Sequence, residues 1–286
     1  MNELRDCRLA IIGLGLMGGS LAGALQGKCL AITGVARRQE TIDMALARQL
    51  VDVGTSDLPS GVAGVDVVVV ATPARVILRQ LEELAPLLKP GCLLMDMGST
   101  KLEITTRMSR LPERVQPLGA HPMCGKEVSG IEAADPNLFR GNPFVLTPLP
   151  RTSDAALRLG YALAEAIGAV PLVLSPVQHD RLVALVSHLP YLLACSLVAT
   201  AQSEAASDPI VWKLVSSGFR DTSRLAASDV TMMLDILMTN RGPALCALRK
   251  YQAQLDSLAE LIETGDESNL RDALSSLSAC RRNLFQ

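Results

Sequence analysis

Short apolar runs alternate with amphipathic segments along the first half of the chain. The runs with the length of β-strands cover 9–13, 31–35, 65–71, 92–97 and 145–147. Four consecutive valines, at 67–70, are typical of an interior parallel strand covered on both faces. A helical segment at 153–167 ends at Gly168 and leads into one more apolar run, 169–174. This alternation predicts βαβ units in a doubly wound, Rossmann-type sheet.

The pattern changes after Ser175-Pro176, where long apolar-periodic stretches follow without strand-like runs. The stretches cover 179–203, 210–216, 228–239, 243–263 and 269–283. This half is expected to be all helix. We therefore predict two domains, an α/β nucleotide-binding domain at 1–174 and an all-α substrate and dimerisation domain at 175–286, for a chain whose 286 residues favour two domains over one. The apolar helices after Pro176 exceed what one small domain can cover, so a homodimer is expected.

Composition and charge narrow the function classes. Aromatic residues are 3% of the chain, so the core must be built from aliphatic side chains and methionine. The net charge of -2 lacks the basic surplus that a nucleic-acid partner would require. The seven cysteines are widely spaced, without a CxxC pair, which indicates a reduced, cytoplasmic compartment. No secretory signal and no metal site are expected.

One stretch, 182–201, has no Asp, Glu, Lys or Arg and is long enough to span a bilayer. His188, Pro190 and three hydroxyl residues interrupt it. Neither a second span nor a flanking basic cluster accompanies it, so a buried central helix is expected and no membrane.

A glycine motif follows the first predicted strand. Gly13, Gly15 and Gly18 form Gly-x-Gly-x-x-Gly, with Leu16 and Met17 between the last two, where a helix is expected to begin. In this context the first glycine permits a tight turn, the second lets a pyrophosphate approach the backbone, and the third lets helix pack on strand. The helix N-terminus adds free N–H groups for the anion. The alternative is that the glycines serve only the turn.

The end of the second strand points to the phosphorylated nucleotide. NAD enzymes place an acid there, whereas this chain has Arg37 and Arg38, which suit the extra phosphate of NADP through charge-assisted bonds. The alternative is two solvated loop charges. Thr72 and Pro73, after the valine strand, are further candidates for cofactor contact.

Two strand ends supply candidate catalytic groups. The segment 95–101, Met-Asp-Met-Gly-Ser-Thr-Lys, places Ser99 at the carboxyl edge of the sheet, and 119–125 does the same for His121. Histidine is well suited to take a proton near neutral pH, so His121 is the candidate base. A purely structural histidine is the alternative.

The helical half holds the other two histidines. His179 and His188 are nine residues apart, so at about 100° per residue they are expected on opposite faces of one continuous helix, unable to line one pocket together. His188 is either a core residue or part of a site. Arg220 and Arg224, beside hydroxyl residues, are a candidate carboxylate clamp, although surface pairing is favoured for Arg220.

The motifs GLGLMGGS, DMGSTK, GAHPMCG, SHLP and GFRDTSR, in this order over nearly the whole chain, resemble those of the prephenate/arogenate dehydrogenases. The resemblance implies a Rossmann domain and a helical dimerisation domain. It also implies oxidative decarboxylation of a cyclohexadienyl acid: hydride goes from the ring carbon bearing the hydroxyl to the nicotinamide, CO₂ leaves, and the aromatic ring of tyrosine forms.

The resemblance also assigns roles. His121 matches the catalytic histidine that accepts the proton of the ring hydroxyl, and Ser99 matches the serine that hydrogen-bonds near that hydroxyl and orients the histidine. Arg224 matches the arginine that receives a substrate carboxylate, and His188 the first histidine of the family's SHLPH.

Departures from the family pattern bear on the substrate. Tyr191 stands where prephenate-preferring members often have a second histidine, and Met233 where they have a tryptophan. Together with Arg37 and Arg38 and the short length, this favours the NADP-dependent branch that takes arogenate. Prephenate remains the alternative.

Two rival classes stay open. A β-hydroxyacid dehydrogenase would share the two-domain plan but typically uses a lysine base on the helical domain, for which Lys213 and Lys250 are candidates. A non-catalytic NADP-binding dimer is the second rival, against which Ser99, His121 and Arg224 argue.

Overall fold

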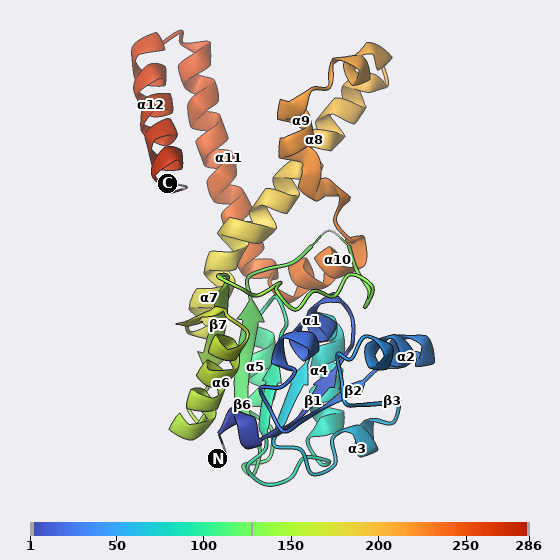
Figure 1. Ribbon diagram of the computed structural model, residues 1–286. Helices are drawn as coiled ribbons and strands as arrows, with labels where there is room; N and C mark the ends of the chain where they lie inside the picture. Colours follow the sequence, from blue (N-terminus) through green and yellow to red (C-terminus); the bar gives the residue numbers. More distant parts are fainter. Residues whose placement is uncertain (1–2, 127, 285–286) are drawn as a thin grey trace.

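The computed structural model describes residues 3–126 and 128–284 and contains an eight-stranded sheet in the order β3-β2-β1-β4-β5-β6-β7-β8 (Figure 1). The strands are β1 (Arg8–Ile12), β2 (Ala31–Val35), β3 (Val53–Thr55), β4 (Val67–Val70), β5 (Leu93–Asp96), β6 (Gln116–Pro122), β7 (Pro143–Pro148) and β8 (Val170–Val173). All neighbours are parallel except β6 and β7. The predicted doubly wound sheet is therefore confirmed, with an antiparallel pair that the sequence pattern did not indicate.

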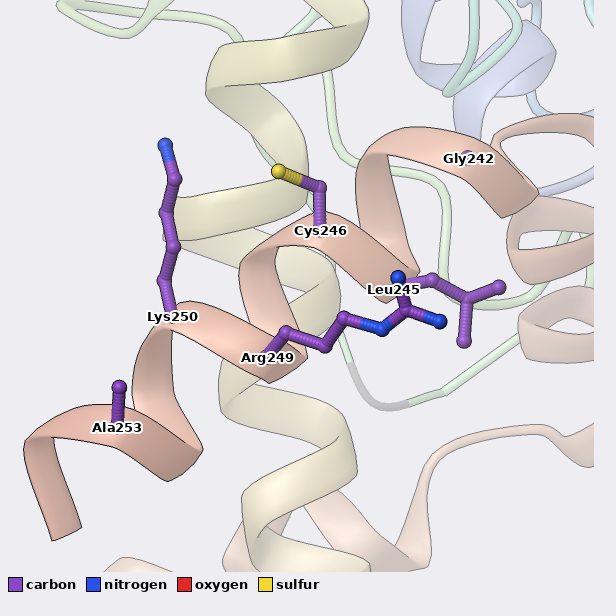
Figure 2. Close-up of a pocket in the computed structure, with 6 residues that line it drawn as sticks. All are labelled: Gly242, Leu245, Cys246, Arg249, Lys250 and Ala253. Atoms are coloured by element: carbon purple, nitrogen blue, oxygen red, sulfur yellow. The ribbon is translucent and has the colours of Figure 1, made fainter. Parts of the chain in front are cut away.

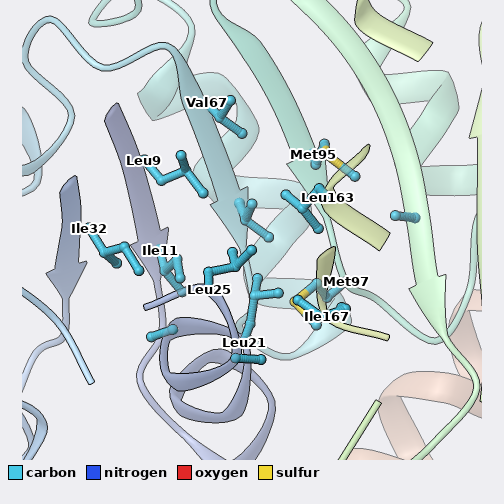
Figure 3. Packing of buried hydrophobic residues seen from close by; sticks show 14 of the residues in the cluster. Leu9, Ile11, Leu21, Leu25, Ile32, Val67, Met95, Met97, Leu163 and Ile167 are labelled. Atoms are coloured by element: carbon cyan, nitrogen blue, oxygen red, sulfur yellow. The ribbon is translucent and has the colours of Figure 1, made fainter. Parts of the chain in front are cut away.

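Helices cover both faces of the sheet. They are η1 (Leu4–Asp6), α1 (Leu16–Leu25), α2 (Gln39–Ala47), α3 (Leu58–Gly61), α4 (Ala74–Leu84), α5 (Leu102–Met108) and α6 (Asp154–Ala166). One apolar cluster joins α1 and α6 to the sheet, with Leu21, Leu25 and Leu163 packed on β1 and β5 (Figure 3). A second cluster, which includes Ile77 and Ile104, joins α4 and α5 to the other face. Because side chains alternate along a strand, β1 supplies both clusters.

The second half of the chain is helical, as predicted. Its elements are α7 (Pro176–Val183), a π-helical turn η2 (Ala184–His188), α8 (Leu189–Ala205), η3 (Pro209–Leu214), α9 (Ser217–Ser223), η4 (Arg224–Ala227), α10 (Val230–Thr239), α11 (Arg241–Glu263) and α12 (Glu267–Asn283). Strand β8 ends at Val173 and the hydroxyl of Ser175 caps α7 by accepting the N–H of Gln178. The expected helix at 210–216 is instead a short 3-10 helix followed by α9.

The helical half is open in shape. In Figure 1, α8 with α9 forms one arm and α11 with α12 forms another, and both point away from the sheet. Within the described residues, α8 has one buried position, Ala194, and α12 has none. Apolar side chains such as Leu255, Ile262 and Leu277 are about half exposed, at 46%, 65% and 59%. These helices therefore have more apolar surface than one chain covers.

Candidate active site

The glycine turn lies where the strand order reverses, between β1 and β4. In doubly wound sheets ligands bind in the crevice at this point. Gly13 follows β1 with a φ of +95°, and a Cβ there would come within 2.7 Å of Thr72 Cγ2. A Cβ on Gly18 would lie 1.9 Å from the carbonyl oxygen of Gly13. Only glycine fits at these two positions, so the turn keeps the start of α1 close to Thr72.

The residues present fit a bound pyrophosphate. A Cβ built on Gly15 meets no atom within 4 Å, so the backbone is open to a ligand on that side. Gly15 is the N-cap of α1 and supplies no side-chain cap, which leaves N–H groups of the first turn, at Leu16 and Met17, for an anion. Pro73 is the N-cap of α4, on the adjacent strand β4.

Arg37 and Arg38 lie directly after β2, exposed, with Arg38 as the N-cap of α2. Strand β2 is the neighbour of β1, so its end lies beside the glycine turn. The guanidinium groups are thus on the side of the crevice where a dinucleotide's ribose would lie.

A buried ion pair holds the end of β5. Lys101 and Asp96 are both fully buried and their side chains pair. Asp96 also accepts the N–H of Gly98 at 2.8 Å and that of Ala120, on the next strand, at 3.1 Å. These bonds fix the loop that holds Ser99, which is half-buried, against the strand that holds His121.

His121 is the penultimate residue of β6 and has a hydrogen-bonded chain behind it. Its Nδ1 lies 2.8 Å from Nε2 of His179, and Nδ1 of His179 lies 2.7 Å from Oδ1 of Asp180. Asp180 in turn accepts the N–H groups of Lys101 and Leu102, at 2.7 and 2.8 Å, at the start of α5. The helical domain thus contacts the sheet domain through the side chains that reach His121.

His188 belongs to the same buried cluster. Its Nδ1 is 3.2 Å from Nδ2 of Asn240, which also donates to the backbone carbonyl of Asp180 at 2.8 Å. The amide donor leaves Nδ1 of His188 as the acceptor, so the neutral ring has its proton on Nε2.

The expectation that His179 and His188 lie on opposite faces of one continuous helix, unable to share a pocket, is wrong. The segment Ala184–His188 is π-helical, with i→i+5 bonding, and it separates α7 from α8. The extra residue in this turn changes the angular relation that an uninterrupted α-helix would impose. Both imidazoles are buried near Asp180 as a result.

Burial and like charge keep these imidazoles neutral. The pKa of His121 is lowered well below its ordinary value by desolvation first, then by His179, Lys101 and His188. Desolvation also lowers the pKa of His188 to about 4, against an opposing effect of Asp180. The pKa of Lys101 is lowered by burial, with Asp96 opposing. A neutral imidazole at neutral pH can accept a proton, as a general base must.

The remaining sequence candidates lie along α8. Tyr191 is part-buried in its first turn, and the neighbouring Cys195 raises the pKa of its phenol. Arg224 begins η4, which packs on α8, and its side chain is exposed. Arg220 is exposed on α9. The printed contacts of the described residues join neither arginine to His121.

Sequence reasoning missed three groups of this cluster as site residues. Asp96 and Lys101 lie in the DMGSTK motif, and the adjacency of His179 and Asp180 just after the domain boundary was a usable signal. No local signal indicates Asn240, whose partners are 52 and 60 residues away.

Two shallow hollows lie elsewhere, along α11. Gly242, Leu245, Cys246, Arg249, Lys250 and Ala253 line the larger, of about 510 Å³ (Figure 2). The second, of about 300 Å³, lies between α7 and α11. Neither is lined by His121, His179 or His188. The continuous helix Pro176–Ala205 is long and apolar enough to cross a bilayer by length and composition, with 28% of its most apolar window buried.

A crevice suited to a dinucleotide, beside a neutral imidazole and a helical second domain, defines a nucleotide-dependent dehydrogenase. Comparison with protein families makes the class specific. Residues 21–173 match the model described as "Prephenate dehydrogenase, nucleotide-binding domain", and residues 175–276 match "Prephenate dehydrogenase, dimerization domain". The chain belongs to the prephenate dehydrogenase family, whose members are oxidoreductases of tyrosine biosynthesis.

Individual relatives agree with the family. The chain is 34% identical to a prephenate dehydrogenase of Bacillus subtilis over 94% of this chain and 74% of the relative. Among solved structures it is similar to the prephenate dehydrogenase from A. aeolicus in complex with hydroxyphenyl propionate and NAD+, with a TM-score of 0.92, 29% identity and coverage of 99% and 100%. It is also similar to the Synechocystis arogenate dehydrogenase, with a TM-score of 0.87, 33% identity and coverage of 97% and 99%.

Proposed function

We propose that this chain is an NADP-dependent arogenate dehydrogenase that acts as a cytoplasmic homodimer. The observation that carries the proposal is the neutral imidazole of His121, which ends a strand at the carboxyl edge of the sheet near the glycine turn. A base in this place can take a proton from a hydroxyl whose carbon faces the nucleotide.

The bound nicotinamide would supply the acceptor for the hydride of that carbon. Nε2 of His121, whose other ring nitrogen is bonded to His179, takes the hydroxyl proton and returns it to the phenol oxygen after CO₂ has left. Ser99 borders the same strand end and would bind near the hydroxyl. No net proton is released, and aromatisation makes the step favourable.

Arg37 and Arg38 support NADP over NAD. No acid stands directly after β2, and two exposed guanidinium groups there can form bidentate bonds to a ribose phosphate. The A. aeolicus relative has NAD+ bound, so cofactor choice in this chain rests on its own residues.

Tyr191 supports arogenate over prephenate. Arogenate has an ammonium group where prephenate has a keto group. A phenol three residues after His188 accepts an ammonium hydrogen bond without adding the positive charge that a protonated histidine there would have. His188 offers an Nε2 proton to a substrate oxygen, and Arg224 offers its guanidinium to a carboxylate.

The exposed surface supports the homodimer. The chain exposes 15248 Å², against about 11,800 Å² expected for a compact monomer of its mass. The difference of roughly 3,400 Å² is of the size that obligate dimers bury. The free cysteines Cys7, Cys29, Cys92, Cys124, Cys195, Cys246 and Cys280 suit a reducing compartment.

The test is an assay of the purified protein with arogenate and prephenate, each with NADP and NAD. We expect the highest kcat/KM with arogenate and NADP. Activity on prephenate alone would show that arogenate is the wrong substrate, and equal use of NAD would remove the role of the arginines. Tyr191→His should shift the ratio of kcat/KM toward prephenate. Sedimentation at several concentrations tests the dimer, which a monomeric mass would exclude.

The rival lysine mechanism has less support. Lys213 is exposed on η3 and Lys250 is exposed on α11, where it lines the outer hollows and not the histidine cluster.

A further inference from the structure

We infer that His179 and Asp180 are positioning residues that fix the tautomer of His121, so that its Nε2 is always the unprotonated, proton-accepting nitrogen. The inference rests on the proposed function for its kinetic consequences, and on the hydrogen-bond geometry for its structural ones.

Each bond of the chain has one direction. A carboxylate only accepts hydrogen bonds, so the 2.7 Å contact with Asp180 requires the proton of neutral His179 to be on Nδ1. Nε2 of His179 is then an acceptor, and the 2.8 Å contact with Nδ1 of His121 requires the proton of His121 to be on Nδ1. Nε2 of His121 is left with its lone pair.

Asp180 is suited to begin this chain because it stays ionised in a buried place. Two backbone N–H groups, of Lys101 and Leu102, donate to its two oxygens, and hydrogen bonds to the charged form of a carboxylate stabilise it. These donors belong to the sheet domain, so they also hold the relay in register with β6. The side chains of His179 and Asp180 are 0% and 2% exposed, which excludes water as a competing partner.

The relay also stabilises the reaction. When His121 accepts the substrate's hydroxyl proton at Nε2, it becomes an imidazolium whose Nδ1–H donates to His179. The charge of Asp180 offsets this positive charge through the ring of His179. Other charged or titratable groups around His121 are His188 on the π turn, and Lys101 and Asp96 at the end of β5. Lys101 lowers the basicity of His121, and Asp180 is the carboxylate that opposes this through a direct chain of bonds.

The first experiment needs no substrate. The chain has three histidines, so nitrogen-15 NMR of the imidazole rings in the whole protein resolves each tautomer, with assignment from His121→Asn and His188→Gln. We expect His121 as the Nδ1–H tautomer at neutral pH, and a mixture of tautomers in His179→Leu. Finding His121 as the Nε2–H tautomer in the unaltered protein would overturn the inference, whatever its activity.

The second experiment is kinetic. His179→Leu should lower kcat by about 10²-fold, within the range of general-base contributions, with little change in KM. His179→Gln should recover part of this loss, because its amide oxygen can still accept from Nδ1–H of His121. A purely structural role would predict no such ranking, and equal loss in both variants with equal unfolding temperatures would contradict the relay.

Asp180→Asn gives the pH signature. Without the carboxylate the imidazolium of His121 is less stable, so the acid limb of kcat/KM should move to lower pH while the plateau falls. The matched control is Asp66→Asn, since Asp66 also accepts a backbone N–H, of Arg8 at 2.8 Å, and pairs with a lysine, but at the opposite edge of the sheet. Its pH profile should be unchanged.

The outcomes separate the two proposals. If the unaltered protein turns over neither acid but His121 has the expected tautomer, the proposed function fails and the relay stands. If turnover is normal but Asp180→Asn keeps both plateau and acid limb, the relay fails and the function stands. Should Asp180→Asn not fold, His179→Gln and His179→Leu decide alone.

Discussion

The sheet domain covers its own core, whereas the helical domain leaves much of its apolar surface exposed. Every residue of β4 and β5 is buried, while α8 has one buried residue and α12 has none among the described positions. The two halves nevertheless have similar apolar content along the sequence. The difference teaches that apolar periodicity predicts which elements form, but not whether the surface that they bury belongs to the same chain.

His121→Asn is expected to have the largest effect, and it tests whether the chemistry resides at the edge of the sheet. Loss of the general base should lower kcat by roughly 10² to 10⁴-fold. Nucleotide binding and the mass in solution should not change, because the turn and the helical arms are untouched. Steady-state kinetics with nucleotide titration checks this, and near-normal turnover would exclude the histidine mechanism.

Phe144→Ala tests the closed core of the sheet domain. Phe144 is 1% exposed in β7, and truncating a buried phenylalanine costs about 3–5 kcal/mol of unfolding free energy. Denaturant titration followed by circular dichroism measures it. The control is Val53→Ala, at a position 54% exposed on the edge strand β3, which should change the free energy by less than about 0.5 kcal/mol.

Acid should destabilise the junction between the two domains. His188 has a pKa lowered to about 4, so below the ordinary histidine pKa the unfolded state binds more protons than the folded state. The unfolding free energy should therefore fall as pH decreases from about 6.5 to about 4, by about 3 kcal/mol from this group. His188→Gln should flatten that part of the profile. An unchanged slope in the variant would show that other groups cause the loss.

Charges placed on α11 test the open face. Leu245 and Leu255 are 43% and 46% exposed, and if a second copy covers them, changing both to Glu should weaken the dimer by roughly 10²-fold or more, from lost apolar burial. Leu30→Glu, at a position 57% exposed on the sheet domain, is the matched control and should leave the dissociation constant unchanged. Equal effects of the two changes would contradict the contrast between the domains.

Arg37→Ala and Arg38→Ala are expected to have the smallest effects. Each should raise the KM for NADP by about 10-fold, the worth of one charge-assisted hydrogen bond, and leave the KM for NAD nearly unchanged. A loss shared equally by both nucleotides would argue against a contact with the extra phosphate.

The sequence predicted the sheet domain better than the site. The valine block and the glycine turn are local signals, and both predicted the doubly wound sheet. Strand β3 has only three residues, and β6 contains Pro117, Gly119 and Pro122, so neither has a strand-like pattern. The antiparallel direction of β7 depends on tertiary packing that no local pattern expresses.

For the site, motif positions predicted His121 and Ser99 as candidates, but the groups behind His121 required the structure. His179 was excluded from a shared pocket because a uniform α-helix was assumed, and a π turn cannot be identified from periodicity over five residues. Asp180 and Asn240 act across 60 residues of chain and through backbone atoms, which a sequence pattern does not encode.

The π turn has a consequence for how this part of the chain can change in length. It contains one residue more than a regular turn of helix would need, so deleting a single residue from it would restore ordinary winding. Everything after the deletion would then rotate by about 100°, taking His188 away from Asn240 and turning the outward side of α8 to a new direction. Substitutions within 184–187 are therefore easier to accommodate than any insertion or deletion, since the spacing between the two histidines sets both the catalytic pocket and the orientation of the arm.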